Sequence, residues 1–560
     1  MSTDMPLSGS EVRTLVDELL HEQRELSAVA KFARASPSTG NRAPGQRHRD
    51  LIPLTAPRPG EQYGFEVDLD RCSGCKGCVT ACHTLNGLDE AESWREVGVL
   101  LGEIQIPASP DPNAGNRVIP WQQTVTTACH HCVEPACLLG CPVLAYDKDP
   151  VTGIVRHLDD QCIGCSYCIL KCPYEVPQFS AKRGIVRKCD MCQGRLAVGE
   201  APACVQACPN EAIRITHVRS DWATIEWREK REATWLPDAP APDYTVPTTR
   251  YLTKTQRPYL AAGDHYRNRP AHAHWPLILL LTLTQIGMGA MLAGWWRNGL
   301  PTTAWNLSRA NLVGLAGFGL FLAGLGASVF HLGQPRKAWR VWLGWRTSWM
   351  SREAIALNLL LGVAGTTAAV STVPLAWLGP LGRADATVPL LPFQVALCGL
   401  LTVAVAVGVV TQIMVYVDTR RSYWSWSQTG PRFLGTVLLG TALAGNWLEP
   451  SPVIAIGLGL ILLLKLAQET RALKPAQSDE SRRTQGRRSA ELILGPLRPL
   501  WCFRLLAAAF GLAAVLFGPS AGLTPLIGGT LASVTLLTGE LAERWLFFAA
   551  VSPDKMPGLP

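Results

Sequence analysis

Long apolar runs dominate the chain from Trp275 onward, where stretches of Leu, Ala, Gly and Val alternate with short polar segments. An α-helix needs about 20 mainly apolar residues to cross the hydrocarbon core of a bilayer. The runs lie near 275–296, 311–332, 354–379, 389–417, 433–448, 452–467, 501–521 and 523–545. This pattern predicts an all-α polytopic bundle of about eight transmembrane helices over 275–550, with a tail at 551–560.

The first part of the chain has a different pattern, with scattered apolar residues among many charged, proline and glycine positions. Ser8 and Glu11 have capping-box spacing and precede apolar residues at helical intervals, which predicts an amphipathic helix early in segment 1–62. Its polar face mixes acidic and basic residues, which favours docking on protein over lying on a membrane. The rest of this segment is interpreted as an extended strap, and 236–274 as a Pro-rich linker. A folded domain is expected between them, over 63–235.

Cysteine usage changes the picture more than composition or length does. The length of 560 residues agrees with at least two domains, because it exceeds what one hydrophobic core supports. Sixteen of the 18 cysteines lie between Cys72 and Cys208. Cys398 and Cys502 stand alone in apolar runs and are interpreted as small core residues. The chemistry of the first half is therefore expected at its thiols.

The sixteen thiols form four groups of four. The groups are Cys72, Cys75, Cys78, Cys82; Cys129, Cys132, Cys137, Cys141; Cys162, Cys165, Cys168, Cys172; and Cys189, Cys192, Cys204, Cys208. The first and third match the C-x2-C-x2-C-x3-C run that binds cubane clusters, and the other two keep its closing C-x3-C. Zinc sites and disulfides do not produce tandem runs of this regularity. The spacing predicts four [4Fe-4S] clusters.

In such runs the fourth thiol serves a neighbouring cluster, so the groups must pair. The short interval between the second and third groups predicts one ferredoxin fold nested within another, an α+β double ferredoxin-like four-cluster domain. The predicted cubes are Cys129, Cys132, Cys137 with Cys172; Cys162, Cys165, Cys168 with Cys141; Cys72, Cys75, Cys78 with Cys208; and Cys189, Cys192, Cys204 with Cys82. A row of clusters conducts electrons and makes no bonds, so no catalytic residue is expected here.

The formal net charge of +8 has a topological explanation, because most of the excess lies in short loops between the apolar runs. No nucleic-acid partner is therefore expected. If the N-terminus is cytoplasmic, fifteen Lys and Arg lie in loops on that side, against only Arg297, Arg309 and Arg383 opposite. No secretory signal or twin arginine opens the sequence. We expect a multi-pass protein of the cell inner (plasma) membrane, in contact with lipid, with the cluster domain and both termini cytoplasmic.

Histidine and charged residues in the apolar runs limit the cofactors. His331 is the one histidine within them, and a membrane b-type haem needs two axial ligands, so no haem is expected. An interfacial histidine satisfied by backbone or water is the simplest interpretation of His331 by position alone. Charged residues gather toward the cytoplasmic side at Lys465, Arg504, Glu540, Glu543 and Arg544. An ion-translocating module needs ionisable groups across the whole membrane, and the outer halves of the helices carry almost none. Ion translocation is therefore kept only as a disfavoured alternative.

The four cysteine groups over 63–235 resemble the electron-transfer subunit of the dimethyl sulfoxide reductase family. The membrane half resembles the anchor subunit of the same enzymes through SVFHLGQPRKAWR (328–340), RTSWMSREA (346–354) and ELAERWLFF (540–548). The resemblance implies that a separate molybdopterin subunit catalyses the substrate reaction while this chain, a fusion of relay and anchor, exchanges electrons with a quinone or quinol. It also implies a quinone site that includes His331, with Ser351, Arg352 and Glu353 as neighbours.

One departure from the family is the expected cytoplasmic position of the relay, since the best-known dimethyl sulfoxide reductases face outward. The substrate of the partner is therefore left open. A cytoplasmic sulfite-oxidising, quinone-reducing complex is one alternative. The same relay in a hydrogenase or formate dehydrogenase complex is another, which the anchor motifs disfavour.

Overall fold

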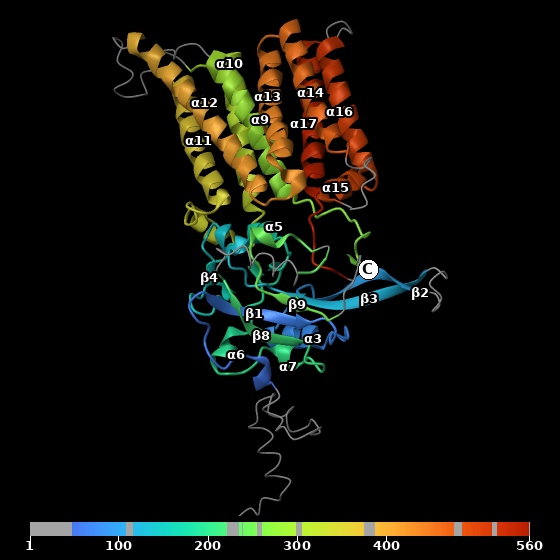
Figure 1. Ribbon diagram of the computed structural model, residues 1–560. Coiled ribbons are helices and arrows are strands. Elements are labelled where there is room, and N and C mark those ends of the chain that lie inside the picture. The colour runs from blue at the N-terminus through green and yellow to red at the C-terminus, as the bar shows by residue number, and fades with distance from the viewer. Residues whose placement is uncertain are drawn as a thin grey trace, which may run out of the picture.

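The computed structural model describes residues 48–107, 116–220, 235–237, 239–254, 260–297, 305–373, 387–474, 484–517 and 524–558. They form two regions, a cysteine-rich region of small sheets and short helices and a bundle of long helices stacked on it (Figure 1). The amphipathic helix expected near the N-terminus lies outside the described residues.

Two three-stranded sheets frame the cysteine-rich region. The first has the order β8-β1-β9, with bounds Ile213–Arg219, Glu61–Asp68 and Arg250–Leu252, and the second has the order β10-β2-β3, with bounds Leu260–Ala262, Arg95–Pro107 and Asn116–Ala128. β1 pairs antiparallel with β8, so Phe65 lies opposite Ile215. The two strands are adjacent although all four cysteine groups lie between them in the sequence. The segment expected as a linker contributes β9, parallel to β1, and β10, antiparallel to β2.

Shorter elements carry or flank the thiols between these sheets. Two hairpins pair β4 (Tyr146–Lys148) with β5 (Val155–His157) and β6 (Gln178–Ser180) with β7 (Ile185–Arg187). The short helices are α3 (Gly77–Asn86), α4 (Ala136–Leu139), α5 (Tyr167–Lys171), α6 (Gln193–Ala197) and α7 (Ala203–Gln206), with 3-10 turns η1 (Arg49–Leu51) and η2 (Pro242–Tyr244). α5 lies next to the bundle, whereas α6 and α7 lie at the opposite end of the region (Figure 1).

The bundle consists of long helices joined by short loops. Its elements are α9 (Trp275–Arg297), α10 (Arg309–Val329), η3 (Pro335–Trp342), α11 (Trp349–Thr372), α12 (Thr387–Val417), η7 (Ser422–Trp424), α13 (Trp426–Leu448), α14 (Pro452–Arg471), α15 (Gln485–Leu494), α16 (Arg498–Phe517) and α17 (Pro525–Ala549). α9 is the central helix, and neighbouring helices bury most of its residues. Glycines allow the close packing: a Cβ on Gly287 would meet the backbone of Gly317, and one on Gly289 would meet that of Val437.

The described helices include six candidate membrane spans, not the eight that the apolar runs predict. The six are α9, α10, α11, the part Phe393–Val417 of α12, α14 and α16. α13 and α17 are as long, at 23 and 25 residues. However, α13 carries Pro431 and Arg432 inside it, and α17 carries Glu540, Glu543 and Arg544. These residues make both helices less apolar than the six candidate spans. The prediction of eight spans counted helices of sufficient length and did not weigh this difference.

Candidate metal centres

The loops of the first and third cysteine groups have the same backbone conformation. Gly74 and Gly164 occupy equivalent positions with φ of 73° and 69°. Lys76 and Ser166, two residues later, are also left-handed, with φ of 60° and 58°, and each precedes a helix. The equivalence shows that the repeated spacing produces a repeated fold, which turns three thiols of each loop toward one point.

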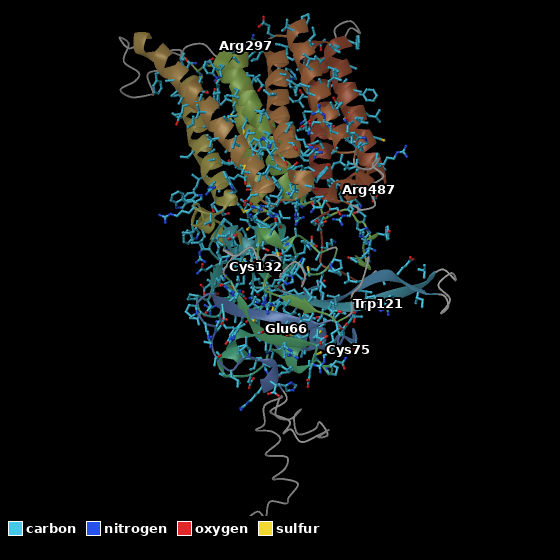
Figure 2. The ribbon with its side chains drawn as sticks, viewed as in Figure 1. Glu66, Cys75, Trp121, Cys132, Arg297 and Arg487 are labelled. Carbon is cyan, nitrogen blue, oxygen red and sulfur yellow. The ribbon has the colours of Figure 1, made fainter. Side chains whose placement is uncertain are left out.

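We name the four predicted sets thiol sites 1 to 4: site 1 is Cys72, Cys75, Cys78 and Cys208; site 2 is Cys82, Cys189, Cys192 and Cys204; site 3 is Cys129, Cys132, Cys137 and Cys172; and site 4 is Cys141, Cys162, Cys165 and Cys168. The four thiols of each of sites 2, 3 and 4 line one common cavity. At site 1, Cys78 lies near Cys208, and the assignment of Cys72 and Cys75 stays a prediction from the spacing. Cys75 lies in the part of the region far from the bundle and Cys132 lies closer to it (Figure 2).

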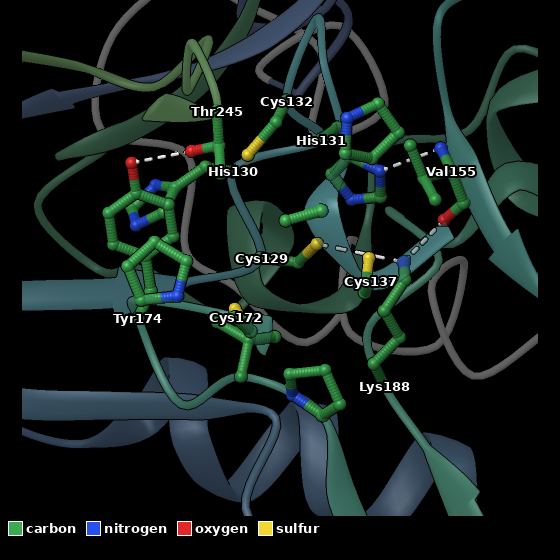
Figure 3. Close-up of a pocket in the computed structure, with 15 residues that line it drawn as sticks. Cys129, His130, His131, Cys132, Cys137, Val155, Cys172, Tyr174, Lys188 and Thr245 are labelled. Atoms are coloured by element: carbon green, nitrogen blue, oxygen red, sulfur yellow. Dashed lines mark hydrogen bonds between the residues drawn. The ribbon is translucent and has the colours of Figure 1, made fainter. Parts of the chain in front are cut away.

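The thiols of sites 2, 3 and 4 each line a cavity. At site 3 the four sulfur atoms surround one such cavity, with His131, Tyr174 and Lys188 on its wall (Figure 3). Site 1 is built by the loop around Ser73, whose Oγ accepts a hydrogen bond of 2.9 Å from Asn210 Nδ2, two residues after Cys208.

The donor set suits iron–sulfur cubes. No three described His, Cys, Asp or Glu side chains could hold one metal ion together. A single zinc ion would draw its thiolates to about 3.8 Å from one another, from the 2.3 Å zinc–sulfur distance and tetrahedral angles. Four soft thiolates around one cavity are instead the donor set of a cubane cluster, which would occupy the space between them.

Backbone amides add hydrogen bonds to the sulfur atoms. Ala145 N donates to Cys141 Sγ at 3.2 Å, and Gly164 N donates to Cys162 Sγ at 3.3 Å. Burial raises the pKa of the Cys172 thiol to about 12, so iron must displace a proton to bind there. At Cys162 burial also raises the pKa, but the hydrogen bond and charge of His157, with backbone hydrogen bonds, lower it below the ordinary value.

Site 4 lies directly against the bundle. Gly333, in the loop after α10, meets Gly164 and Gly184 so closely that a Cβ on Gly333 would overlap the backbone of Gly184. Both partner glycines have left-handed φ, 69° and 65°, which side chains rarely adopt. Because this contact has no side chains, the loop reaches site 4, where Gln334 N donates to the carbonyl oxygen of Ile163 at 3.0 Å.

The residues expected at the quinone site separate into two groups. His331 Nε2 lies 2.9 Å from the carbonyl oxygen of Cys165, and the buried Ser351 Oγ donates to the carbonyl oxygen of Pro142 at 3.2 Å. Glu353 is buried near the start of α11, just after its first turn. Arg352 instead turns to the loop before α11, where its guanidinium donates to backbone carbonyl oxygens. The described ion pairs include none between Arg352 and Glu353, so the arginine does not hold that carboxylate.

A histidine that the sequence does not single out, His274, lies beside His331 with ring centroids 5.1 Å apart. Burial, with the nearby rings of His331 and His272, lowers the pKa of His274 to about 4. Burial also lowers the pKa of His331, although its bond to the Cys165 carbonyl opposes the shift. Both rings are therefore neutral at pH 7. His274 was missed because it precedes α9 and so lies outside the apolar run.

The charged residues expected toward one side of the bundle form a buried network. Its ion pairs are Lys465–Glu540 at 2.5 Å, Arg504–Glu540 at 2.9 Å, Arg504–Glu469 at 3.2 Å, Arg544–Glu543 at 2.6 Å and Arg432–Glu543 at 3.8 Å. The network joins α13, α14, α16 and α17. Arg432 and Glu469 were not expected in it, because they lie at the ends of apolar runs.

Known proteins match the cysteine-rich half. A 4Fe-4S dicluster domain family matches residues 121–218. The B subunit of the anaerobic dimethyl sulfoxide reductase of Haemophilus influenzae is 33% identical over 204 residues, which are 36% of this chain and 94% of the relative. The YnfG subunit of a probable anaerobic dimethyl sulfoxide reductase of Escherichia coli (strain K12) is 37% identical over 186 residues, 32% of this chain and 82% of the relative.

A third relative, the iron-sulfur subunit of the nitrate-inducible formate dehydrogenase of Escherichia coli (strain K12), is 32% identical over 194 residues. That match covers 32% of this chain and 63% of the relative. The Haemophilus relative is covered almost completely, and the matching family model carries the same 4Fe-4S assignment that the thiol spacing predicts. The chain therefore belongs to the family of iron–sulfur electron-transfer subunits of dimethyl sulfoxide reductases.

Proposed function

We propose that this chain is both the electron-transfer and the membrane-anchor subunit of a molybdopterin-dependent oxidoreductase. In this role it relays electrons between a membrane quinone pool and a separate catalytic subunit. The observation that supports the proposal most strongly is the continuity of the path. Four thiol sites follow one another through the cysteine-rich region, and the last of them contacts the helix bundle through His331.

All sixteen thiols are proposed as ligands, four to each [4Fe-4S] cluster, which supplies one-electron transfer when bound. The protein positions the clusters, and it excludes water most fully at site 4, where all four thiols are buried. Site 4 belongs to the same hydrophobic core as Leu281 of α9 and Trp424 beside α12, so apolar packing seals its side toward the membrane. Site 1 lies at the opposite end, which suits electron exchange with the catalytic subunit.

The quinone is proposed to bind beside site 4, within reach of His331, Ser351 and Glu353. Oxidation of a quinol releases two electrons and two protons, so the site needs a proton acceptor next to the electron path. A carbonyl oxygen can only accept, so His331 Nε2 carries the proton that it shares with Cys165. In the neutral ring Nδ1 is then the acceptor, available to a quinol hydroxyl.

Orientation follows the loop charges. The cysteine-rich region lies on the side of the bundle that holds the basic loops, which supports a cytoplasmic cluster domain in the inner membrane. Arg297 lies at the opposite end of the bundle (Figure 2). Identifying the subunit that copurifies with this chain would establish which substrate the catalytic partner acts on.

The experiment is His331→Ala in the intact chain, with His272→Ala as the matched control. The exposed ring of His272 lies 4.8 Å from that of His274, between ring centroids, and no hydrogen bond or ring contact among the described residues joins it to site 4. We expect both variants to retain about 16 iron atoms per chain, from four cubes of four, and to be reduced by dithionite. Only His331→Ala should lose electron exchange with quinone, measured by stopped-flow bleaching of the clusters. Unchanged exchange in His331→Ala would remove this residue from the mechanism, and absence of iron would refute the relay itself.

A further inference from the structure

Arg95 is a fully buried cation between sites 1 and 2. Its guanidinium lines the cavity of site 2, and its Nη1 donates to Thr126 Oγ1 at 3.1 Å. Thr126 Oγ1 lies 3.5 Å from the sulfur of Cys78, which belongs to site 1. The guanidinium stacks 4.7 Å above the ring of Phe65, and its Nη2 is buried without a hydrogen-bond partner among the described residues. Burying a guanidinium N–H that has no hydrogen-bond partner is costly, unless a bound group accepts its hydrogen bond.

Lys188 has the corresponding position between sites 2 and 3. Its ammonium lies 3.6 Å from the sulfur of Cys129 at site 3 and donates a hydrogen bond to the carbonyl oxygen of Val155 (Figure 3). A further hydrogen bond of 2.8 Å goes to the carbonyl oxygen of Cys189, a residue of site 2. Lys188 is 3% exposed. Two carbonyls stabilise its charge without neutralising it.

Neither cation forms an ion pair with a carboxylate in the described part of the chain. Arg95 lines the cavity of site 2 together with the four thiols of that site and the carboxylate of Asp190, with which it forms no ion pair among the described residues. Asp190 adjoins Lys188 but is only half-buried, and one of its oxygens already accepts a hydrogen bond from Cys192 N. The positive charges of Arg95 and Lys188 are thus left facing the thiol sites.

The gap between sites 3 and 4 is occupied differently. Its buried polar side chain is Tyr146, which is neutral, and which packs edge-on against His157 at 5.0 Å between ring centroids. The buried Lys171 nearby is paired with Asp418 at 2.7 Å. Among the described residues, site 2 is therefore the one thiol site with a fully buried cation on each side, and neither of these two cations is paired with a carboxylate.

Reduction of a cluster adds one negative charge to it and breaks no bond. A cation in a low-dielectric interior stabilises that added charge much more than the same cation would in water. We propose, building on the relay function above, that Arg95 and Lys188 set the order of reduction along the relay and make site 2 the most easily reduced of the four centres. An electron from site 3 or site 1 would then collect at site 2.

The first measurement is a redox titration of the unaltered chain, in which dithionite and redox mediators set the potential and EPR spectroscopy monitors the reduced clusters. The signal that appears first on reduction should be the one that Cys204→Ser alters and Cys137→Ser leaves in place. A first signal belonging to any other site would overturn the proposal. Because no quinone takes part, the outcome is independent of whether the His331 reaction occurs. Iron analysis separately reports whether the clusters exist.

The second measurement uses charge-removing variants that keep hydrogen-bond donors. Lys188→Gln should lower the ratio of reduced to oxidised centre at sites 2 and 3 at least tenfold at fixed ambient potential, a shift of about 59 mV for one electron. Arg95→Gln should do the same at sites 1 and 2, so that only site 2 responds to both variants. Equal shifts at all four sites, or none with iron retained, would contradict the assignment.

Two controls separate charge from structure. Lys188→Arg and Arg95→Lys keep the charge and should keep site 2 as the first centre reduced, even if a glutamine variant loses iron. A different order in these swaps would overturn the proposal. Lys76→Gln removes an exposed cation next to Cys75 and should shift site 1 less than Arg95→Gln does, because water screens it. An equal shift would mean that burial is not what gives Arg95 its effect.

Discussion

Buried cations occur in both regions of the molecule, but the groups that face them differ. In the cysteine-rich region Arg95 and Lys188 face thiols and polar oxygens, without a carboxylate partner among the described residues. In the bundle Lys465 and Arg504 both contact one carboxylate, Glu540, at 2.5 and 2.9 Å. In the cysteine-rich region the buried Arg187 is paired with Glu92 at 3.3 Å, but Arg95 and Lys188 keep their positive charge for a group that the polypeptide does not supply. In the bundle the charges of Lys465 and Arg504 are neutralised in place.

The difference indicates what each set of charges does. A charge buried without a partner is costly, so it persists where a bound group compensates it. The bundle network connects four helices, and two of these, α13 and α17, are not apolar enough to count among the candidate spans. Their polar groups find partners inside the protein instead of lipid, as intramembrane charges require. Paired charges that link helices support an anchoring role over ion translocation.

The largest expected effect is that of Glu540→Ala, which leaves two buried cations without their shared carboxylate. Removing one partner of a buried pair costs roughly 3–5 kcal/mol. We expect a loss of that size in the free energy of unfolding in detergent, followed by tryptophan fluorescence. The double variant Lys465→Met with Glu540→Gln removes a cation as well, and should recover more than half of the loss. If the single variant costs under about 1 kcal/mol, the network is not what holds these helices.

A medium effect is expected at the contact between the two regions. Gly333→Ala places a methyl group against the backbone of Gly184, and such overpacking costs about 1–3 kcal/mol. Electron exchange with quinone should slow while the clusters stay reducible by dithionite. Gly326→Ala is the matched control on α10, because a Cβ there meets nothing within 4 Å. Equal rates in the two variants would show that the glycine contact does not couple the regions.

The smallest effect is expected where the charges are exposed. Arg297 and Glu449 form an ion pair of 2.9 Å at the end of the bundle away from the thiol sites, with side chains 47% and 69% exposed. Exposed pairs contribute about 0–1 kcal/mol, so Arg297→Ala should change the free energy of unfolding by no more than that. The same fluorescence assay measures it, with and without added salt. A loss comparable to that of Glu540→Ala would erase the distinction between buried and exposed pairs.

Sequence alone determined the features that depend on short spacing. Three thiols separated by two residues each must share one loop, so their grouping follows from the spacing, and the repeated φ values at Gly74 and Gly164 show the shared geometry. The closing C-x3-C of each group, with the short interval between the second and third groups, also predicted which distant thiol completes each set. Apolar length likewise predicted a helical bundle, because crossing a bilayer takes a minimum number of apolar residues.

Only the tertiary structure decided which single polar residues matter. Arg95 and Lys188 look like ordinary surface charges in the sequence, and they become buried because β2 and the segment before Cys189 fold between thiol sites. His274 joins His331 only through the packing of the chain ahead of α9 against the loop after α10. Spacing constrains neighbours within one loop or helix turn, whereas contacts between distant segments depend on how whole elements pack. For that reason the thiols could be grouped from the sequence, and the charges between them could not.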